Sequence, residues 1–102
     1  MPKGYWIAHV DVRDQDGYQI YVKALPEVMK KYGGRYVIRG GKYEDMEGHC
    51  RSRNVVIEFP SYEQAMACYR SADYQSAAAH RKAAADTELM VIEGFDGPQP
   101  GD

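Results

Sequence analysis

Segments with strand periodicity and segments with helix periodicity follow one another along this chain in an order that few folds share. Apolar residues rich in aromatic and β-branched types occupy residues 5–12, two runs within 35–60, and residues 88–95. Apolar residues spaced three and four apart mark one helix over residues 18–32 and a second helical region over 61–85. The predicted order is strand, helix, strand, strand, helix, strand.

Local signals define the ends of the first helix. Asp14 and Asp16 precede it and can cap its N-terminus, and Gly33-Gly34 provides a left-handed C-terminal stop. Pro26 lies off the apolar stripe, on the outer face, where it is predicted to kink or split the helix.

The central region predicts a long hairpin over residues 35–60. Gly40-Gly41 indicates a bulge or a close backbone approach, after which the second strand is expected to resume. Ser61 with Gln64 fits a capping box at the start of the next helix. The segment Ser71-Ala72-Asp73 ends that helix and caps another, so the second helical region has two pieces.

This order predicts an α+β fold of the ferredoxin-like βαββαβ type, a four-stranded antiparallel sheet with helices on one face. Right-handed crossovers place the first and third strands in the middle of the sheet. A chain of 102 residues has room for one domain, expected over residues 1–96. The Gly- and Pro-containing residues 97–102 are predicted to form a flexible C-terminal tail.

Both faces of the sheet are expected to be covered. One parity of the strands is entirely apolar: Trp6, Ala8, Val10, Val12, Tyr36, Ile38, Val55, Ile57, Phe59, Met90 and Ile92. The other parity mixes apolar and charged residues: Tyr5, Ile7, His9, Asp11, Val37, Arg39, Val56, Glu58, Leu89, Val91 and Glu93. A solvent-facing surface would carry more charge. Because helices cover only one face, the pattern predicts a two-fold homodimer that joins sheet to sheet.

Charge and composition exclude several classes. A net charge of −2 without a basic patch argues against nucleic-acid binding, including by a sheet of the RNA-recognition type. No apolar run or signal-peptide pattern predicts a membrane or secretory protein, so a cytoplasmic location is expected, with Cys50 and Cys68 reduced. His9, His49 and His80 share no ligand spacing, so no metal is predicted, and no motif calls for a cofactor.

Several ordered motifs resemble one family over nearly the whole chain, residues 4–95. They are Gly4-Tyr5-Trp6-Ile7-Ala8-His9-Val10, Arg39-Gly40-Gly41, Glu47-Gly48, Arg53 with Val55-Val56-Ile57-Glu58-Phe59-Pro60-Ser61, and Ser71-x-x-Tyr74 with Arg81. They resemble the family of domain of unknown function 1330, a branch of the dimeric α+β barrel superfamily. That superfamily includes antibiotic-biosynthesis monooxygenases and muconolactone isomerases. The resemblance implies a fold and a dimer, and it implies no particular reaction.

Charges within apolar strands indicate where a site lies. His9 and Glu58 lie on strands that are neighbours in the predicted sheet, which makes them candidate catalytic residues for proton transfer. Arg39 and Glu58 are expected to form a cross-strand ion pair.

Three further residues come from the helices. Tyr21, Tyr74 and Arg81 are predicted to join Arg39 in binding substrate, with Arg81 suited to hold a carboxylate. Arg81 falls on the inward stripe of its helix, which is an unusual place for a charge without a partner.

The leading hypothesis is a homodimer that binds a small anionic or aromatic molecule between sheet and helices. If it is an enzyme, the expected chemistry is cofactor-free proton transfer or oxygenation. The alternative is a non-catalytic dimer in which the strand charges form satisfied networks that fix assembly.

Overall fold

The computed structural model describes residues 1–102. The elements, in chain order, are β1 (Gly4–Val12), α1 (Gln15–Lys31), β2 (Arg35–Arg39), β3 (Arg53–Phe59), α2 (Tyr62–Arg70), α3 (Ala72–Ala84) and β4 (Ala85–Glu93). The predicted ferredoxin-like βαββαβ fold is therefore confirmed. None of the three helices has the length and the apolar character that a membrane crossing requires.

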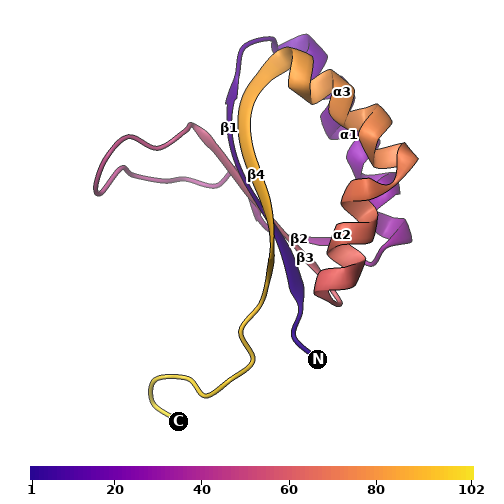
Figure 1. The fold of residues 1–102 in the computed structure, drawn as a ribbon. Coiled ribbons are helices and arrows are strands. Elements are labelled where there is room, and N and C mark those ends of the chain that lie inside the picture. The colour runs from indigo at the N-terminus through magenta and orange to yellow at the C-terminus, as the bar shows by residue number, and fades with distance from the viewer.

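The sheet has the strand order β2-β3-β1-β4, and every neighbouring pair is antiparallel. The first and third strands occupy the centre, as the handedness of the crossovers predicts. All three helices cover the same face of the sheet, and the opposite face has no helix on it (Figure 1). We call this opposite surface the open face.

The first helix begins and ends where its capping residues predict. The Asp14 side chain accepts a hydrogen bond from the backbone N–H of Gly17, and Gly33 adopts the left-handed backbone with φ of 75°. Of the two effects predicted for Pro26, a split of the helix is wrong, because α1 runs unbroken past it. Pro26 is exposed, which agrees with its predicted place on the outer face of the helix.

Ser71 joins the second and third helices. Its hydroxyl donates to the carbonyl of Cys68 at 2.8 Å, at the end of α2, and accepts from the backbone N–H of Tyr74 at 3.1 Å, at the start of α3. The predicted division of the second helical region into two pieces is confirmed.

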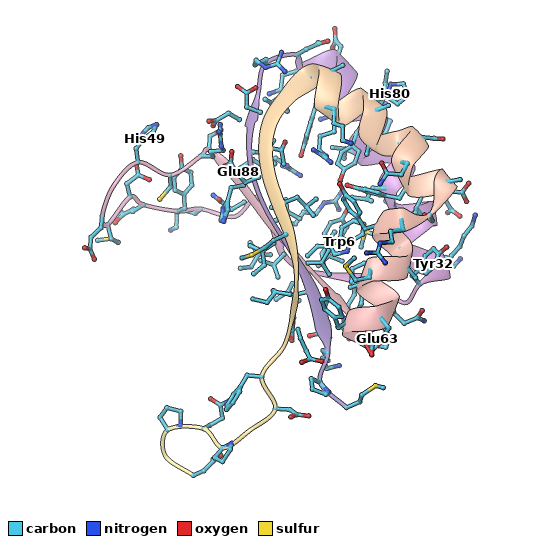
Figure 2. All side chains as sticks on the ribbon, viewed as in Figure 1. Trp6, Tyr32, His49, Glu63, His80 and Glu88 are labelled. Atoms are coloured by element: carbon cyan, nitrogen blue, oxygen red, sulfur yellow. The ribbon has the colours of Figure 1, made fainter.

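Trp6 lies at the centre of the core between the sheet and the helices (Figure 2). It is 1% exposed, and its ring centroid is 5.1 Å from that of Phe59 and 4.7 Å from that of Tyr74. Its indole N–H donates to the carbonyl of Ala65 on α2 at 2.9 Å. One side chain therefore links β1 to β3, α2 and α3.

The predicted division of strand residues between the two faces is correct for β1 and β3 and wrong for parts of the edge strands. In β4, Met90 pairs with Ile7 and Ile92 pairs with Tyr5, which places Met90 and Ile92 on the open face. Leu89 and Val91 instead share the helix side with their partners on β1. The alternation within β4 is as predicted, but its register to β1 has no signature in the sequence.

The second strand departs from the predicted division between the two faces for another reason. Its register with β3 shifts between Tyr36 and Ile38, so Val37 is the extra residue of a bulge. Tyr36 pairs with Ile57 on the helix side, whereas Ile38 pairs with Val56 on the open face. The irregularity that the two glycines predict therefore occurs three residues earlier.

The prediction that the second strand resumes after Gly41 is also wrong. Strand β2 ends at Arg39, and residues 40–52, which we call the arm, contain no strand. The arm projects from the sheet on the side away from the helices (Figure 1). Gly40 starts it with φ of 62°, and a Cβ atom there would meet Arg53 Nη1 at 2.8 Å.

Candidate functional site

Arg81 is a buried cation within the core of the helix side. It projects inward from α3 and is only 5% exposed, which confirms its predicted place on the inward stripe. Its Nη2 donates to the hydroxyl of Tyr74 at 3.4 Å, and its Cζ lies 5.4 Å from the ring centroid of Tyr21. The two tyrosine hydroxyls are 3.1 Å apart. The buried Arg81 Nε has no hydrogen-bond partner.

The two tyrosines do not neutralise this charge. Burial raises the pKa of Tyr21 well above its ordinary value and also raises the pKa of Tyr74, so both are neutral phenols. Desolvation alone would lower the pKa of Arg81, but the oxygens of Tyr74 and Tyr21 outweigh it, and this pKa lies above its usual value. The core therefore holds a charged guanidinium among neutral groups.

Two more arginines, Arg53 and Arg39, lie between this buried core and the surface. The Nε of Arg53 donates to the hydroxyl of Tyr18 at 3.1 Å, and the Tyr18 ring centroid is 5.7 Å from that of Tyr21. At the sheet edge, Cζ of Arg39 lies 4.3 Å from the ring centroid of Tyr36, a cation–π contact. Arg39 is exposed, Arg53 is partly buried and Arg81 is buried.

We call these residues the arginine–tyrosine cluster: Tyr18, Tyr21, Tyr36, Arg39, Arg53, Tyr74 and Arg81. None of its three arginines takes part in any ion pair of the molecule. The expected cavity between sheet and helices is closed here, because the aromatic rings pack together and the three cavities of the structure lie elsewhere. An arginine cluster without carboxylates is suited to hold an anion.

His9 and Glu58 do not form the predicted pair. His9 is aligned with Asn54 on β3, and its Nδ1 lies 2.7 Å from Asn54 Oδ1. Glu58 is aligned with Tyr5, at the other end of the same strands, where it accepts from the Tyr5 hydroxyl at 3.2 Å. The Glu58 carboxylate also lies 3.3 Å from Lys3 Nζ. Adjacent strands place their residues in contact only where the register aligns them.

The predicted ion pair between Arg39 and Glu58 is wrong. Glu58 is aligned with Arg35, and Arg39 is aligned with Val55. The bulge at Val37 also turns Arg39 to the helix side. Arg39 consequently lies with the arginine–tyrosine cluster, across the sheet from Glu58.

The structure thus divides the six predicted site residues into two groups. Tyr21, Arg39, Tyr74 and Arg81 belong to one cluster on the helix side, and His9 and Glu58 lie apart from each other on the open face. Sequence reasoning missed Tyr18, Tyr36 and Arg53 as members of the cluster. The signal for Arg53 was a charge at the start of an apolar strand, whereas Tyr18 resembles any core tyrosine of a helical stripe.

On the open face, an ion network holds the base of the arm. Arg51 donates from Nε and Nη2 to the two carboxylate oxygens of Glu88 at 2.7 and 2.8 Å, and from Nη1 to Asp11 at 2.8 Å. The backbone N–H of Ser52 also donates to Asp11, at 3.0 Å. Between arm and sheet lies a cleft of about 520 Å³, lined by His9, Tyr43, Glu44, His49, Cys50, Arg51, Asn54 and Glu88.

This network predicts how the arm responds to acid. The Ser52 N–H, followed by Arg51, lowers the pKa of Asp11 below its ordinary 3.8, and Arg51 lowers that of Glu88 below its ordinary 4.5. Because the two pKa values are lowered in the folded protein, the ionised carboxylates stabilise the anchored arm fully at a pH above the ordinary pKa values. This stabilisation is lost as the pH falls through the pKa values of the folded protein. In Arg51→Gln, carboxyl NMR titrations of Asp11 and Glu88 are expected to shift to higher pH. Unchanged midpoints would contradict this, and Arg70→Gln, a substitution of an exposed arginine on α2, is the control variant.

Comparisons with known proteins agree with this fold. The sequence profile of the family described as Domain of unknown function (DUF1330) matches residues 3–95. The crystal structure of the RPA0582 protein of unknown function from Rhodopseudomonas palustris is similar, with a TM-score of 0.76 and 20% identity over 94% of this chain and 85% of that one. No curated protein matches this sequence significantly.

Two further structures share the fold at low sequence identity. SnoaB, a cofactor-independent oxygenase from Streptomyces nogalater, has a TM-score of 0.63 and 11% identity over 98% of this chain and 97% of its own. A dimeric ferredoxin-like protein of unknown function from Thermobifida fusca has a TM-score of 0.59 and 14% identity over 90% and 91%. With a family profile that spans nearly all of its residues, the chain belongs to the Domain of unknown function (DUF1330) family.

Proposed function

We propose that this protein binds a small aromatic or other carboxylic acid in the arginine–tyrosine cluster, with Arg81 as the group that holds the carboxylate. The supporting observation is that Arg81 is only 5% exposed and has no carboxylate partner. Its Nε also has no hydrogen-bond partner. A buried charge without a counter-charge is costly, and an anionic ligand would offset that cost. The neighbouring tyrosine rings would contact an aromatic body.

Entry is proposed at the edge of the sheet, through Arg39 and Tyr36. Strand β2 has only five residues and a bulge, so it is the part of the sheet that is easiest to displace. Arg39 would meet the anion first, Arg53 next and Arg81 last. Movement of the Tyr36 and Tyr18 rings would open the space that is closed in the free protein.

If the ligand is a substrate, the neutral hydroxyls of Tyr21 and Tyr74 are the groups placed to donate a proton to it. The likeness in fold to a cofactor-independent oxygenase supports a reaction that needs no cofactor. His9 and Glu58 lie across the sheet, so we assign them no part in chemistry at this cluster.

The single tryptophan of the chain reports on this site, because the Trp6 ring lies 4.7 Å from that of Tyr74. Titration with 4-hydroxyphenylacetate is expected to change Trp6 fluorescence and to saturate. The corresponding neutral amide is expected to bind at least about tenfold more weakly, since it lacks the charge that a buried arginine would bind. Equal responses to acid and amide, or none to either, would exclude the proposed anion site.

We further infer that the protein is a homodimer joined through the open face. Large apolar residues on and beside this face are exposed, with Ile38 at 47%, Met90 at 50% and Ile92 at 43%. Apolar patches of this kind mark protein interfaces. Solved proteins of this fold are described as dimeric, which supports a second copy as the partner.

Met90→Lys is expected to weaken the dimer about tenfold or more, because an ammonium would replace an apolar contact in the interface. Ile20→Lys is the matched control: Ile20 is also 50% exposed but lies on α1, away from the open face. Light scattering over a dilution series measures both variants. Equal dissociation of the two variants, or a wild-type monomer, would remove the open face as the interface.

The alternative is a non-catalytic dimer whose charges serve assembly. The network of Asp11, Arg51 and Glu88 favours it, because these groups satisfy one another at the dimer surface. That explanation does not extend to Arg81, which has no such partners.

A further inference from the structure

The cleft under the arm is suited to a ligand of the opposite charge from the one proposed for the arginine–tyrosine cluster. It opens on the other side of the sheet, where His49 on the arm and Glu88 on β4 lie (Figure 2). A smaller cavity of about 140 Å³ adjoins it and shares His9 and Glu88 with it. The groups that line both spaces decide what could bind.

His9 presents a hydrogen-bond acceptor in this cleft. The amide nitrogen of Asn54 donates to the carbonyl of Arg51 at 3.2 Å, which fixes Asn54 Oδ1 as the atom that meets His9. Because Asn54 Oδ1 can only accept, Nδ1 of His9 carries the hydrogen in that contact. In the neutral ring the other nitrogen, Nε2, then has a lone pair and no partner in the molecule.

The only arginine of the cleft has little left to offer an anion. All three guanidinium nitrogens of Arg51 already donate to Glu88 and Asp11. Glu44 lines the cleft without an ion-pair partner, so the lining holds two carboxylates, Glu44 and Glu88, against one arginine. Among the carboxylates and the arginine of the lining, the surplus charge is therefore negative.

The adjoining cavity is mainly apolar, with Ile7, Leu89 and Met90 beside His9 and Glu88. A ligand that fills both spaces needs an apolar body and a cationic hydrogen-bond donor. We propose that this cleft is a second binding site, for a small molecule that carries a protonated amine on an apolar body. The ammonium would donate to His9 Nε2 and lie near Glu44, and the apolar body would contact Ile7 and Met90.

The test uses phenethylamine as the probe and phenylacetate as its counterpart of opposite charge. Side-chain ¹H–¹⁵N spectra of the full-length protein distinguish the three histidines. Phenethylamine is expected to shift the His9 Nε2 resonance until saturation, and phenylacetate is not. No His9 shift with the amine, or an equal shift with both probes, would overturn the proposal.

Two variants locate the amine. Glu44→Gln is expected to weaken phenethylamine about threefold to fivefold, as for the loss of an exposed ion pair. His9→Phe, which keeps a ring but removes the acceptor, is expected to weaken it about tenfold or more. Glu63→Gln on α2 is the charge-matched control and is expected to leave the affinity unchanged. Equal affinity in Glu44→Gln, His9→Phe and Glu63→Gln would overturn the site.

The dimer provides a further check, since the cleft lies on the same side as the open face. Binding is expected both to the wild-type protein and to Ile92→Lys, an open-face variant outside the lining of both spaces, at concentrations where their assembly differs. Binding only by a dissociated variant would mean that the second copy fills the cleft, which would overturn the proposal. This outcome is independent of the anion site, because the Trp6 fluorescence response to 4-hydroxyphenylacetate tests that site separately.

Discussion

Arg81→Met is expected to abolish binding of 4-hydroxyphenylacetate while leaving the fold as stable as before or more stable. Loss of one partner of a buried charge pair costs about 2–5 kcal/mol of binding free energy, so affinity should fall about 30-fold or more. In the free protein, however, the guanidinium has no counter-charge. Methionine fills a similar volume, and replacing buried charge by apolar groups is often neutral or stabilising, by up to about 4 kcal/mol.

The two hydroxyls that Arg81 contacts keep a partner in this variant, because Tyr21 and Tyr74 lie within hydrogen-bond distance of each other at 3.1 Å. Arg70→Met, an exposed arginine of α2 without an ion pair, is the control and should change neither property. Urea unfolding followed by circular dichroism gives the stability. If Arg81→Met unfolds at much lower urea than the wild type, the guanidinium holds the fold together, and the assembly hypothesis gains over the binding hypothesis.

Trp6→Ala is expected to lower the free energy of unfolding by about 3–5 kcal/mol, the range found when large aromatic side chains are removed from cores. Two losses combine here. The cavity would lie between Phe59, Tyr69 and Tyr74, whose rings all contact the indole, and the carbonyl of Ala65 would lose its donor. The whole free energy of unfolding of a domain is only about 5–15 kcal/mol. A large fraction of the variant molecules would therefore be unfolded at modest urea concentrations.

Phe95→Ala is the matched control, because Phe95 is 72% exposed beyond the end of β4 and its removal should cost little. Circular dichroism is the readout, since the variant lacks the only tryptophan. Both proteins must be compared at one protein concentration, because dimerisation adds to apparent stability. A loss below about 1 kcal/mol would mean that the core collapses around the gap and that Trp6 is not its centre.

The sequence predicted the fold correctly because the helices and central strands carry strong periodic signals. The stripe from Tyr18 to Met29 on α1 and the alternation of β1 each have one way to bury their apolar residues. Capping residues such as Asp14 and Ser61 also act over only three residues, so their effects can be read locally.

The contacts of the site were harder to predict, because they depend on register. His9 was correctly placed on the strand next to β3, yet its partner is Asn54, four positions from Glu58. The bulge at Val37 has no glycine or proline to mark it, and it moved Arg39 to the other face. Arg81 and the two tyrosines were predicted together because a helical stripe fixes which residues face inward, whatever the register of the sheet.

The joint at Ser71 has a mechanical consequence for the proposed site. One hydroxyl serves the end of α2 and the start of α3, and the residue that it holds on α3 is Tyr74 itself. The two helices therefore cannot shift independently at this point, and any tilt of α2 is transmitted to the phenol beside Arg81. Substitutions on the outer surface of α2, far from the ligand, would therefore change the position of the Tyr74 phenol. In this small protein, natural variation in ligand preference could accumulate on α2 while every residue of the cluster stays the same.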